Sequence, residues 1–99
     1  MTEMLLCERS TQEGLLVSVC DADVLGETFE KDELSLTVEP EFYDGEKATS
    51  DEVVSSLAGA SVANLVGVEA VETAIEAGFI EEANVLEFEG TRHAQYLRM

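Results

Sequence analysis

Apolar and polar residues alternate in short runs along the first half of the chain, and this pattern predicts strands. Met4 to Glu8 and Leu15 to Cys20 are apolar runs, and the polar stretch between them ends at Gly14. The spacing predicts a β-hairpin in which Gly14 supplies the positive φ of the turn.

The two cysteines belong to these two runs. If the loop consists of Glu13-Gly14, the register places Cys7 opposite Cys20, which permits a cross-strand contact or a bridge. Two buried, inert and reduced thiols are the favoured interpretation, because an intracellular pair defaults to the reduced state. Their number and separation do not match a zinc site of the usual paired spacing.

A second strand signal follows, where Leu34, Leu36 and Val38 alternate with polar residues and Pro40 ends the run. The residues from Phe42 to Gly45 predict a turn or loop.

Helices are predicted in the second half of the chain. Thr49 and Glu52 have the spacing of a capping box, with Gly59 at the expected C-terminal end of a short helix. A second helix begins near Val68, and Gly78 is the expected stop. The apolar stripes of the two helices are Val53, Val54 and Leu57 in the first, and Val71, Ala74, Ile75 and Phe79 in the second.

The segment from Ser61 to Gly67 is small and apolar, and its periodicity leaves a strand and a helix entrance equally open. The run from Val85 to Phe88 then predicts a strand, Glu89-Gly90 a turn, and His93 to Arg98 a closing strand. This order predicts an α+β fold, in which a mainly antiparallel sheet carries two short helices on one face. Residues 1–99 are expected to form a single small domain.

The composition indicates the environment in which the protein works. The chain has 22 Asp and Glu against 5 Lys and Arg, which gives a formal charge of -17, while 45% of its residues are hydrophobic. This apolar content excludes a disordered acidic chain. A basic leader and an apolar run of membrane-spanning length are both missing from the sequence, so we expect a soluble, cytoplasmic protein without a membrane partner.

The negative charge predicts a dependence on salt. Coulomb repulsion over a surface of this size sums to on the order of 10 kcal/mol at an ionic strength of about 0.01 M, falls to about 2 kcal/mol at 0.15 M and is negligible near 1 M. A halophilic, solvated surface is therefore the favoured interpretation of the acidity. A nucleic-acid mimic and a calcium binder are the alternatives, and neither a phosphate-like row of carboxylates nor a dense oxygen-ligand loop is visible.

The best surface candidate is the C-terminal segment. His93 is the only histidine, so neutral-pH proton transfer by an ordinary imidazole would need it. Gln95 lies two residues further on the same strand face, and Arg92 and Arg98 bracket the pair. The alternative is structural, with a hydrogen bond for His93 and salt bridges for the two arginines.

Other chemistry is weakly supported. Asn64 lies inside an apolar segment, so it must find partners if it is buried, either as a helix cap or at a ligand. A nucleophilic pair of Cys20 with His93 has no support in the spacing, and Asp21 with Asp23 is a weak Mg²⁺ signal. Gly-rich phosphate motifs are absent. We therefore expect no metal and no cofactor.

Three pieces of the sequence, taken in order, resemble an archaeal family catalogued as domain of unknown function 424. They are Val19-Cys20-Asp21 with Leu25-Gly26 and Phe29, then Ala63-Asn64-Leu65-Val66-Gly67, then His93-Ala94-Gln95. The resemblance spans almost the whole chain, and the acidic composition looks like that of a haloarchaeal member. It implies an archaeal cytosolic setting and, by analogy alone, an association with translation, while it supplies no activity.

The leading hypothesis from the sequence is a non-enzymatic interaction module that binds a protein or ribonucleoprotein partner. The predicted binding residues are Asn64, Arg92, His93, Gln95 and Arg98. The rival is a small enzyme in which His93 is the general acid or base and Asn64 or Gln95 orients the substrate, which requires a pocket that encloses them. A homo-oligomer that buries a sheet edge is the third alternative.

Overall fold

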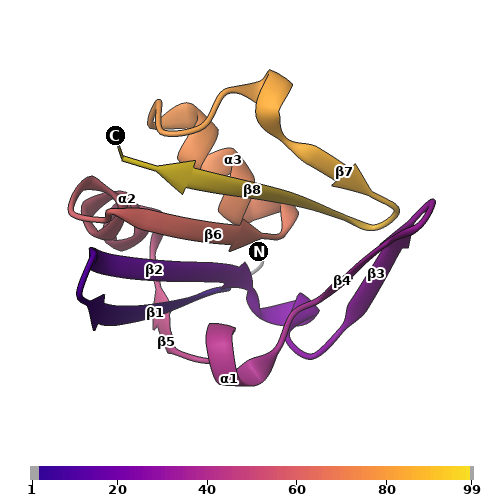
Figure 1. Ribbon diagram of the computed structural model, residues 1–99, viewed down its shortest axis with the longest axis horizontal. Helices are drawn as coiled ribbons and strands as arrows, with labels where there is room; N and C mark the ends of the chain where they lie inside the picture. The colour runs from indigo at the N-terminus through magenta and orange to yellow at the C-terminus, as the bar shows by residue number, and fades with distance from the viewer. Residues whose placement is uncertain (1–2, 99) are drawn as a thin grey trace.

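Residues 3–98 are described by a computed structural model, in which a sheet of strand order β5-β1-β2-β6-β8-β7 forms the centre (Figure 1). Its strands are β1 (Met4–Thr11), β2 (Gly14–Asp21), β5 (Glu46–Ala48), β6 (Val62–Val66), β7 (Leu86–Phe88) and β8 (Thr91–Leu97). A separate hairpin consists of β3 (Thr28–Lys31) and β4 (Leu34–Thr37). The helices are α1 (Pro40–Tyr43), α2 (Ser50–Ala58) and α3 (Val68–Glu76), with 3₁₀ turns at Ala22–Val24 and Glu82–Asn84.

The predicted α+β fold is confirmed, with one difference in strand direction. β2 and β6 pair in parallel, whereas the neighbours β1–β2, β1–β5, β6–β8 and β7–β8 pair antiparallel. The undecided segment is β6, at the centre of the sheet. It shows no clean alternation because it is buried from both sides, Ala63 and Leu65 against the helices and Val66 against the opposite cluster.

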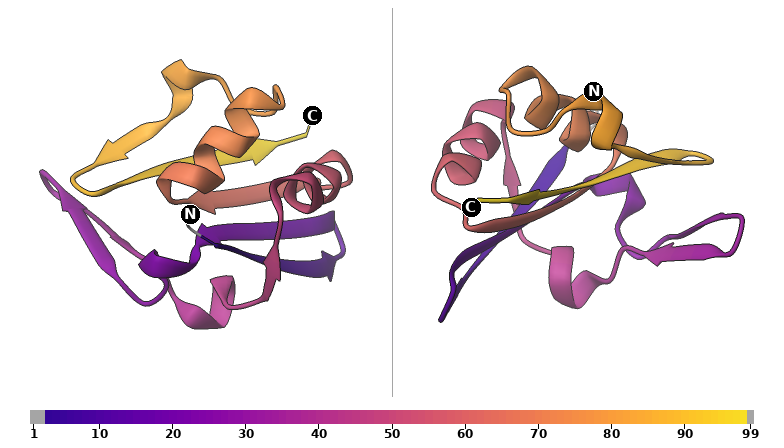
Figure 2. Two further views of the ribbon diagram at one scale, coloured as in Figure 1. Left: turned by 180° about the vertical axis from the view of Figure 1, so that it is seen from behind. Right: turned by 45° about the horizontal axis from the view of Figure 1, so that its top comes forward.

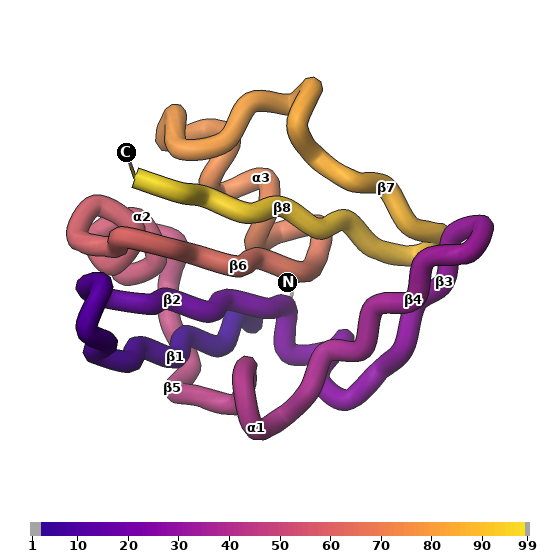
Figure 3. The backbone as a smooth tube through the Cα atoms, in the orientation of Figure 1, coloured from indigo at the N-terminus to yellow at the C-terminus, as the bar shows by residue number. Residues whose placement is uncertain are grey.

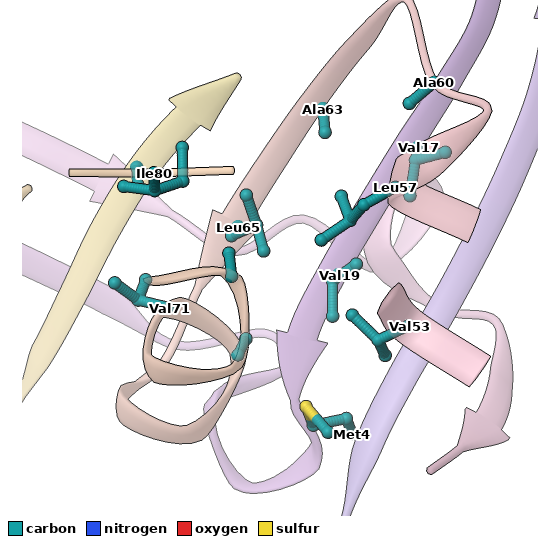
Figure 4. Packing of buried hydrophobic residues seen from close by; sticks show 13 residues of the cluster. Met4, Val17, Val19, Val53, Leu57, Ala60, Ala63, Leu65, Val71 and Ile80 are labelled. Atoms are coloured by element: carbon teal, nitrogen blue, oxygen red, sulfur yellow. The ribbon is translucent and has the colours of Figure 1, made fainter. Parts of the chain in front are cut away.

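Both predicted helices, α2 and α3, cover one face of the sheet (Figure 2). Leu57 of α2 and Val71 of α3 are fully buried, and they pack in one cluster with Val17 and Leu65 of the sheet (Figure 4). Burial of each such side chain contributes about 1.5–3 kcal/mol. This cluster is the main core, and it fixes the orientation of β2, β6 and β8.

The helix boundaries follow the signals in the sequence. Thr49 and Glu52 form the predicted capping box, in which the Thr49 side chain accepts from the Glu52 backbone N–H and the Glu52 carboxylate accepts from the Thr49 backbone N–H. Gly78, with a φ of 86°, follows the C-cap of α3. At the end of α2, Gly59 is the C-cap but keeps a right-handed φ of -98°.

A second, smaller cluster lies on the opposite face of the sheet. Val38 and Tyr43 are buried there against Cys20 and Val66 of the sheet. The expected loop after Pro40 is in part the short helix α1, which begins with Pro40 and brings Tyr43 into this cluster. The β3–β4 hairpin extends away from it, and its tip lies beside the turn between β7 and β8 (Figure 3).

The β1–β2 hairpin forms as predicted, with Gly14 at a φ of 116°, but its loop is shifted by one residue. Thr11 pairs with Gly14, so the loop consists of Gln12-Glu13. The Thr11 hydroxyl donates to the Gly14 carbonyl at 2.7 Å and accepts the N–H of Glu13 at 3.2 Å. These bonds close the turn one residue earlier than expected.

This shift changes the neighbours of both cysteines. Cys7 pairs with Ser18, and Cys20 pairs with Leu5, so the expectation that Cys7 lies opposite Cys20 is wrong. Both thiols are free, and Cys20 is fully buried.

Candidate functional site

The face of β2, β6 and β8 that points away from α2 and α3 is the candidate site, and we call it the open face. Figure 1 views the sheet from this side, and no helix or strand crosses in front of β6 and β8. Because successive side chains of a strand alternate between faces, the strand register arranges this face in rows. The rows are Leu16, Val62 and Leu97; Ser18, Asn64 and Gln95; and Cys20, Val66 and His93.

Part of the open face is already covered. Cys20 and Val66 belong to the smaller cluster, and Ser18 is buried. The remaining side chains are half-buried or exposed, and we call them the acid-free patch: Leu16, Val62, Asn64, His93, Gln95 and Leu97. Leu97 is the most exposed of the large hydrophobic residues, at 61%.

The charge of this patch differs from that of the rest of the chain. Among the residues that the structure describes, β2, β6 and β8 place no Asp or Glu on the open face, although 22 of 99 residues are acidic. By contrast, α1 and the β3–β4 hairpin, on the same side of the sheet, both carry acids. Removing water from apolar and amide groups costs less free energy than removing it from carboxylates, provided that the amides find hydrogen-bond partners.

The polar centre of the patch is a pair of amides on neighbouring strands. The structure places Asn64 opposite Gln95, and Gln95 Nε2 donates to Asn64 Oδ1 at 2.9 Å. The amide pair leaves Asn64 Nδ2 and Gln95 Oε1 without a hydrogen-bond partner within residues 3–98. A free donor and a free acceptor therefore lie side by side at the surface.

His93 borders the amide pair and is half-buried. Its Nδ1 lies 3.0 Å from the backbone carbonyl oxygen of Leu65, an acceptor for the Nδ1–H tautomer. This hydrogen bond fixes the orientation of the ring and leaves Nε2 as its acceptor nitrogen. The pairing with Cys20 considered from the sequence is absent, because Val66 lies between the two in the strand register. Burial and, secondarily, the charge of Asp21 raise the pKa of the Cys20 thiol to about 12, so it stays protonated.

Arg92 and Arg98 lie on the other face of the sheet. Arg92 contacts the carboxylates of Glu82 and Glu87, and these hydrogen bonds raise the pKa of its guanidinium. The Arg98 guanidinium donates to the carbonyl of Ala58 at the end of α2, where a cation is favoured by the helix dipole. The structure thus divides the five predicted binding residues into Asn64, His93 and Gln95 on the open face and two engaged arginines behind it.

Asp21 has a role that the sequence interpretation missed. Its carboxylate accepts the backbone N–H groups of Glu69 at 3.1 Å and Ala70 at 2.9 Å, which caps the N-terminus of α3 from the end of β2. Gly67, at a φ of 123°, brings the chain so close that a Cβ there would lie 2.4 Å from Asp21 Cγ. Asn64 therefore does not cap this helix. Burial of the carboxylate raises the pKa of Asp21, although the two N–H bonds oppose the shift.

Two hollows are found away from the acid-free patch. The larger, of about 700 Å³, lies beside α3 and is lined by Glu69, Glu72 and Glu76 together with the ion pair of Lys47 and Glu3. The smaller, of about 340 Å³, lies along β1 and β5. Neither is lined by Asn64, His93 or Gln95. Within the described part of the chain, no group of three or more His, Cys, Asp or Glu side chains is placed to hold a metal ion.

The structure also bears on membrane association. Across residues 3–98, no helix combines the length and the apolar character that crossing a bilayer requires.

Comparison with known proteins places the chain in context. The family model described as Protein of unknown function (DUF424) matches residues 8–99, which confirms the resemblance inferred from the sequence. No curated protein matches the chain. A crystal structure of an uncharacterized conserved protein from Methanopyrus kandleri is similar, with a TM-score of 0.78 and 22% identity, and the match covers 98% of this chain and 95% of that chain. At this identity the likeness shows the fold alone.

Proposed function

We propose that this chain, which belongs to the family described as Protein of unknown function (DUF424), is a non-enzymatic interaction module that binds a protein partner through the acid-free patch. One observation carries this proposal. In a chain with a formal charge of -17, the accessible side chains of the central strands on the open face include no carboxylate.

The chemistry of the patch suits a protein partner. The core of a protein interface is depleted of charged residues and combines apolar area with a few hydrogen bonds. Leu16, Val62 and Leu97 supply apolar area in one row, and Asn64 with Gln95 supplies a donor and an acceptor in the next. Burial of such a surface does not require the removal of water from a charge.

A ribonucleoprotein is the related possibility, in which this module contacts the protein component. RNA contact through Arg92 and Arg98 is less favoured, because both guanidinium groups are engaged within the chain. The charge of -17 also repels phosphate. We further propose a salt-rich archaeal cytosol as the setting, because salt screens the repulsion between the carboxylates.

The experiment compares partner capture by two variants that add the same charge to different exposed leucines. Leu97→Asp places a carboxylate in the acid-free patch, whereas Leu34→Asp places one on the β3–β4 hairpin, where Leu34 is 53% exposed. We expect Leu97→Asp to lose the proteins captured from a high-salt lysate and Leu34→Asp to retain them. Equal capture by both variants would contradict the proposal.

The enzyme alternative is tested in parallel with His93→Ala. This substitution removes the only imidazole and leaves the amide pair and Leu97 in place. We expect it to reduce capture less than Leu97→Asp does. Loss of a cellular activity in His93→Ala, with capture unchanged, would favour the enzyme instead.

A further inference from the structure

We infer that a second copy of this chain occupies the acid-free patch, in a two-fold symmetric dimer that covers the patch until another partner binds. This inference rests on the proposed function, since it names an occupant of the same surface. Three features of the patch support it.

The first feature is the self-complementary chemistry of the amide pair. After the internal bond, Asn64 retains free N–H donors and Gln95 retains a free carbonyl oxygen. In a two-fold interface, each contact occurs twice with the roles exchanged. Asn64 of one copy can therefore donate to Gln95 of the partner subunit, while Asn64 of the partner subunit donates to Gln95 of the first copy. The two free groups of one molecule are the complement of the same two groups in its copy.

The second feature is the apolar row next to the amides. Leu16, Val62 and Leu97 cross β2, β6 and β8 in register, and the row ends at the exposed Leu97. A row of this kind beside the amide pair provides the apolar area that an interface core needs. When the two-fold axis runs parallel to the strands between β6 and β8, Val62 of one copy lies against Leu97 of the partner subunit, and the reverse contact occurs as well.

The third feature is electrostatic. Two molecules that each carry a formal charge of -17 repel one another, and contact is least unfavourable where neither surface presents a carboxylate. The acid-free patch meets this condition for both molecules at once. Because the remaining repulsion is long-ranged, salt must favour the dimer, whereas salt weakens the attraction of this acidic chain to a basic partner. The sign of the salt effect therefore distinguishes a second copy from a basic partner.

The test is sedimentation equilibrium of the full chain from about 1 µM to about 1 mM protein. We expect a monomer–dimer equilibrium that tightens about tenfold or more when KCl is raised from about 0.05 M to about 1 M. Leu97→Asp is expected to weaken the dimer about 30-fold or more, because it buries an unpaired carboxylate of each copy in the interface, while Leu34→Asp has little effect. Gln95→Glu supplies a second test at an exposed position, and circular dichroism checks that each variant is folded.

Each outcome decides between the claims. A wild-type chain that stays monomeric in about 1 M KCl, or a dimer that Leu97→Asp and Gln95→Glu leave unchanged, overturns the dimer. If the chain is monomeric but Leu97→Asp still loses its captured partners, the dimer is wrong and the interaction module stands. If the wild-type chain dimerises through the patch but capture is equal in all variants, the dimer stands and the proposed function is wrong.

Discussion

The two faces of the central sheet are built from the same strands, but they meet water in different ways. On the helix-bearing face, Val17, Leu65 and Ala94 are sealed beneath α2 and α3, and the acids lie outside on the helices. On the open face, the smaller cluster covers only one end of the strands. The acid-free patch beyond it is half-buried or exposed and has no carboxylate, although the helix α3 alone carries Glu69, Glu72 and Glu76.

This difference separates two uses of apolar residues. On the helix-bearing face, apolar side chains stabilise the fold, and charge on the outside keeps the molecule dissolved. On the open face, neutral side chains remain in contact with water, where they add little to the stability of the monomer. Under the proposed function, that surface is the interaction site. Each of the following predictions assigns an effect to one face.

The largest expected effect is that of salt on the acidic exterior. Lowering KCl from about 1 M to about 0.01 M should reduce the free energy of unfolding by up to about 10 kcal/mol, with most of the loss below about 0.15 M. Denaturation in urea at several KCl concentrations measures it. The triple variant Glu69→Gln, Glu72→Gln and Glu76→Gln removes three of the negative charges, and since Coulomb repulsion scales with the square of the charge, the salt effect should shrink by about a third.

The control replaces neutral residues on the open face. Asn64→Ala with Gln95→Ala removes no charge, so the salt dependence of the monomer should match that of the wild type. If the wild-type chain were as stable in salt-free buffer as in about 1 M KCl, the view that the acids adapt it to brine would be contradicted.

The next effect is a contrast between two leucines. Leu65 is fully buried beneath the helices, and Leu65→Ala should cost about 2–5 kcal/mol through lost burial and the cavity left behind. Leu97 is 61% exposed, so Leu97→Ala should cost about 0.5 kcal/mol or less in the monomer. Urea denaturation at low protein concentration and high salt measures both. A similar cost for the two substitutions would mean that the open face also holds the fold together.

Local signals in the sequence predicted much of the fold. The Thr49–Glu52 capping box, Gly78 after α3 and the Glu89-Gly90 turn each depend on residues close in the chain. The strands β3 and β5 and the helix α1 were not predicted, because, unlike the equally short β4 and β7, they show no alternation of apolar and polar residues. Segments this short form through tertiary contacts, such as the pairing of β5 with β1, and carry little periodicity of their own.

The candidate site was predicted in part, for a related reason. Asn64 and Gln95 were recognised as polar residues in apolar segments, but their hydrogen bond depends on the register of β6 with β8, which pairs residues far apart in the chain. The placement of His93 and Arg92 on opposite faces could have been predicted from the sequence. Adjacent residues of a strand point to opposite faces, so a strand that begins before His93 already places Arg92 behind the sheet.

A smaller effect is expected from Asp21, on the helix-bearing face, which caps α3 from the end of β2. Asp21→Ala should cost about 0.5–2 kcal/mol by leaving the helix N–H groups without an acceptor. Burial raises the pKa of Asp21 above its ordinary value of 3.8. The folded state then binds the proton more tightly than the unfolded state. The contribution of this proton binding to stability is complete below pH 3.8 and is lost as the pH rises through the folded-state pKa.

Asp21→Asn carries no such proton, so it isolates this contribution. The stability of the wild type relative to Asp21→Asn should fall as the pH rises from below 3.8. Urea denaturation at high salt across this pH range gives the difference. Glu30→Gln, which removes a charge from the β3–β4 hairpin, serves as the control for the general effect of charge. A difference between wild type and Asp21→Asn that grows with pH would show that the N–H bonds outweigh burial.

The smallest effect is expected from the amide pair, and it bears most directly on the open face. A double-mutant cycle with Asn64→Ala and Gln95→Ala should give a coupling free energy of about 0.2–1 kcal/mol in the monomer, as for other cross-strand pairs in contact with water. The same cycle measured on dimer dissociation should give a larger coupling, because the free donor and acceptor of each copy then act across the interface. If the coupling is instead large in the monomer and unchanged in the dimer, the pair stabilises the sheet, and the acid-free patch loses its polar centre as a contact surface.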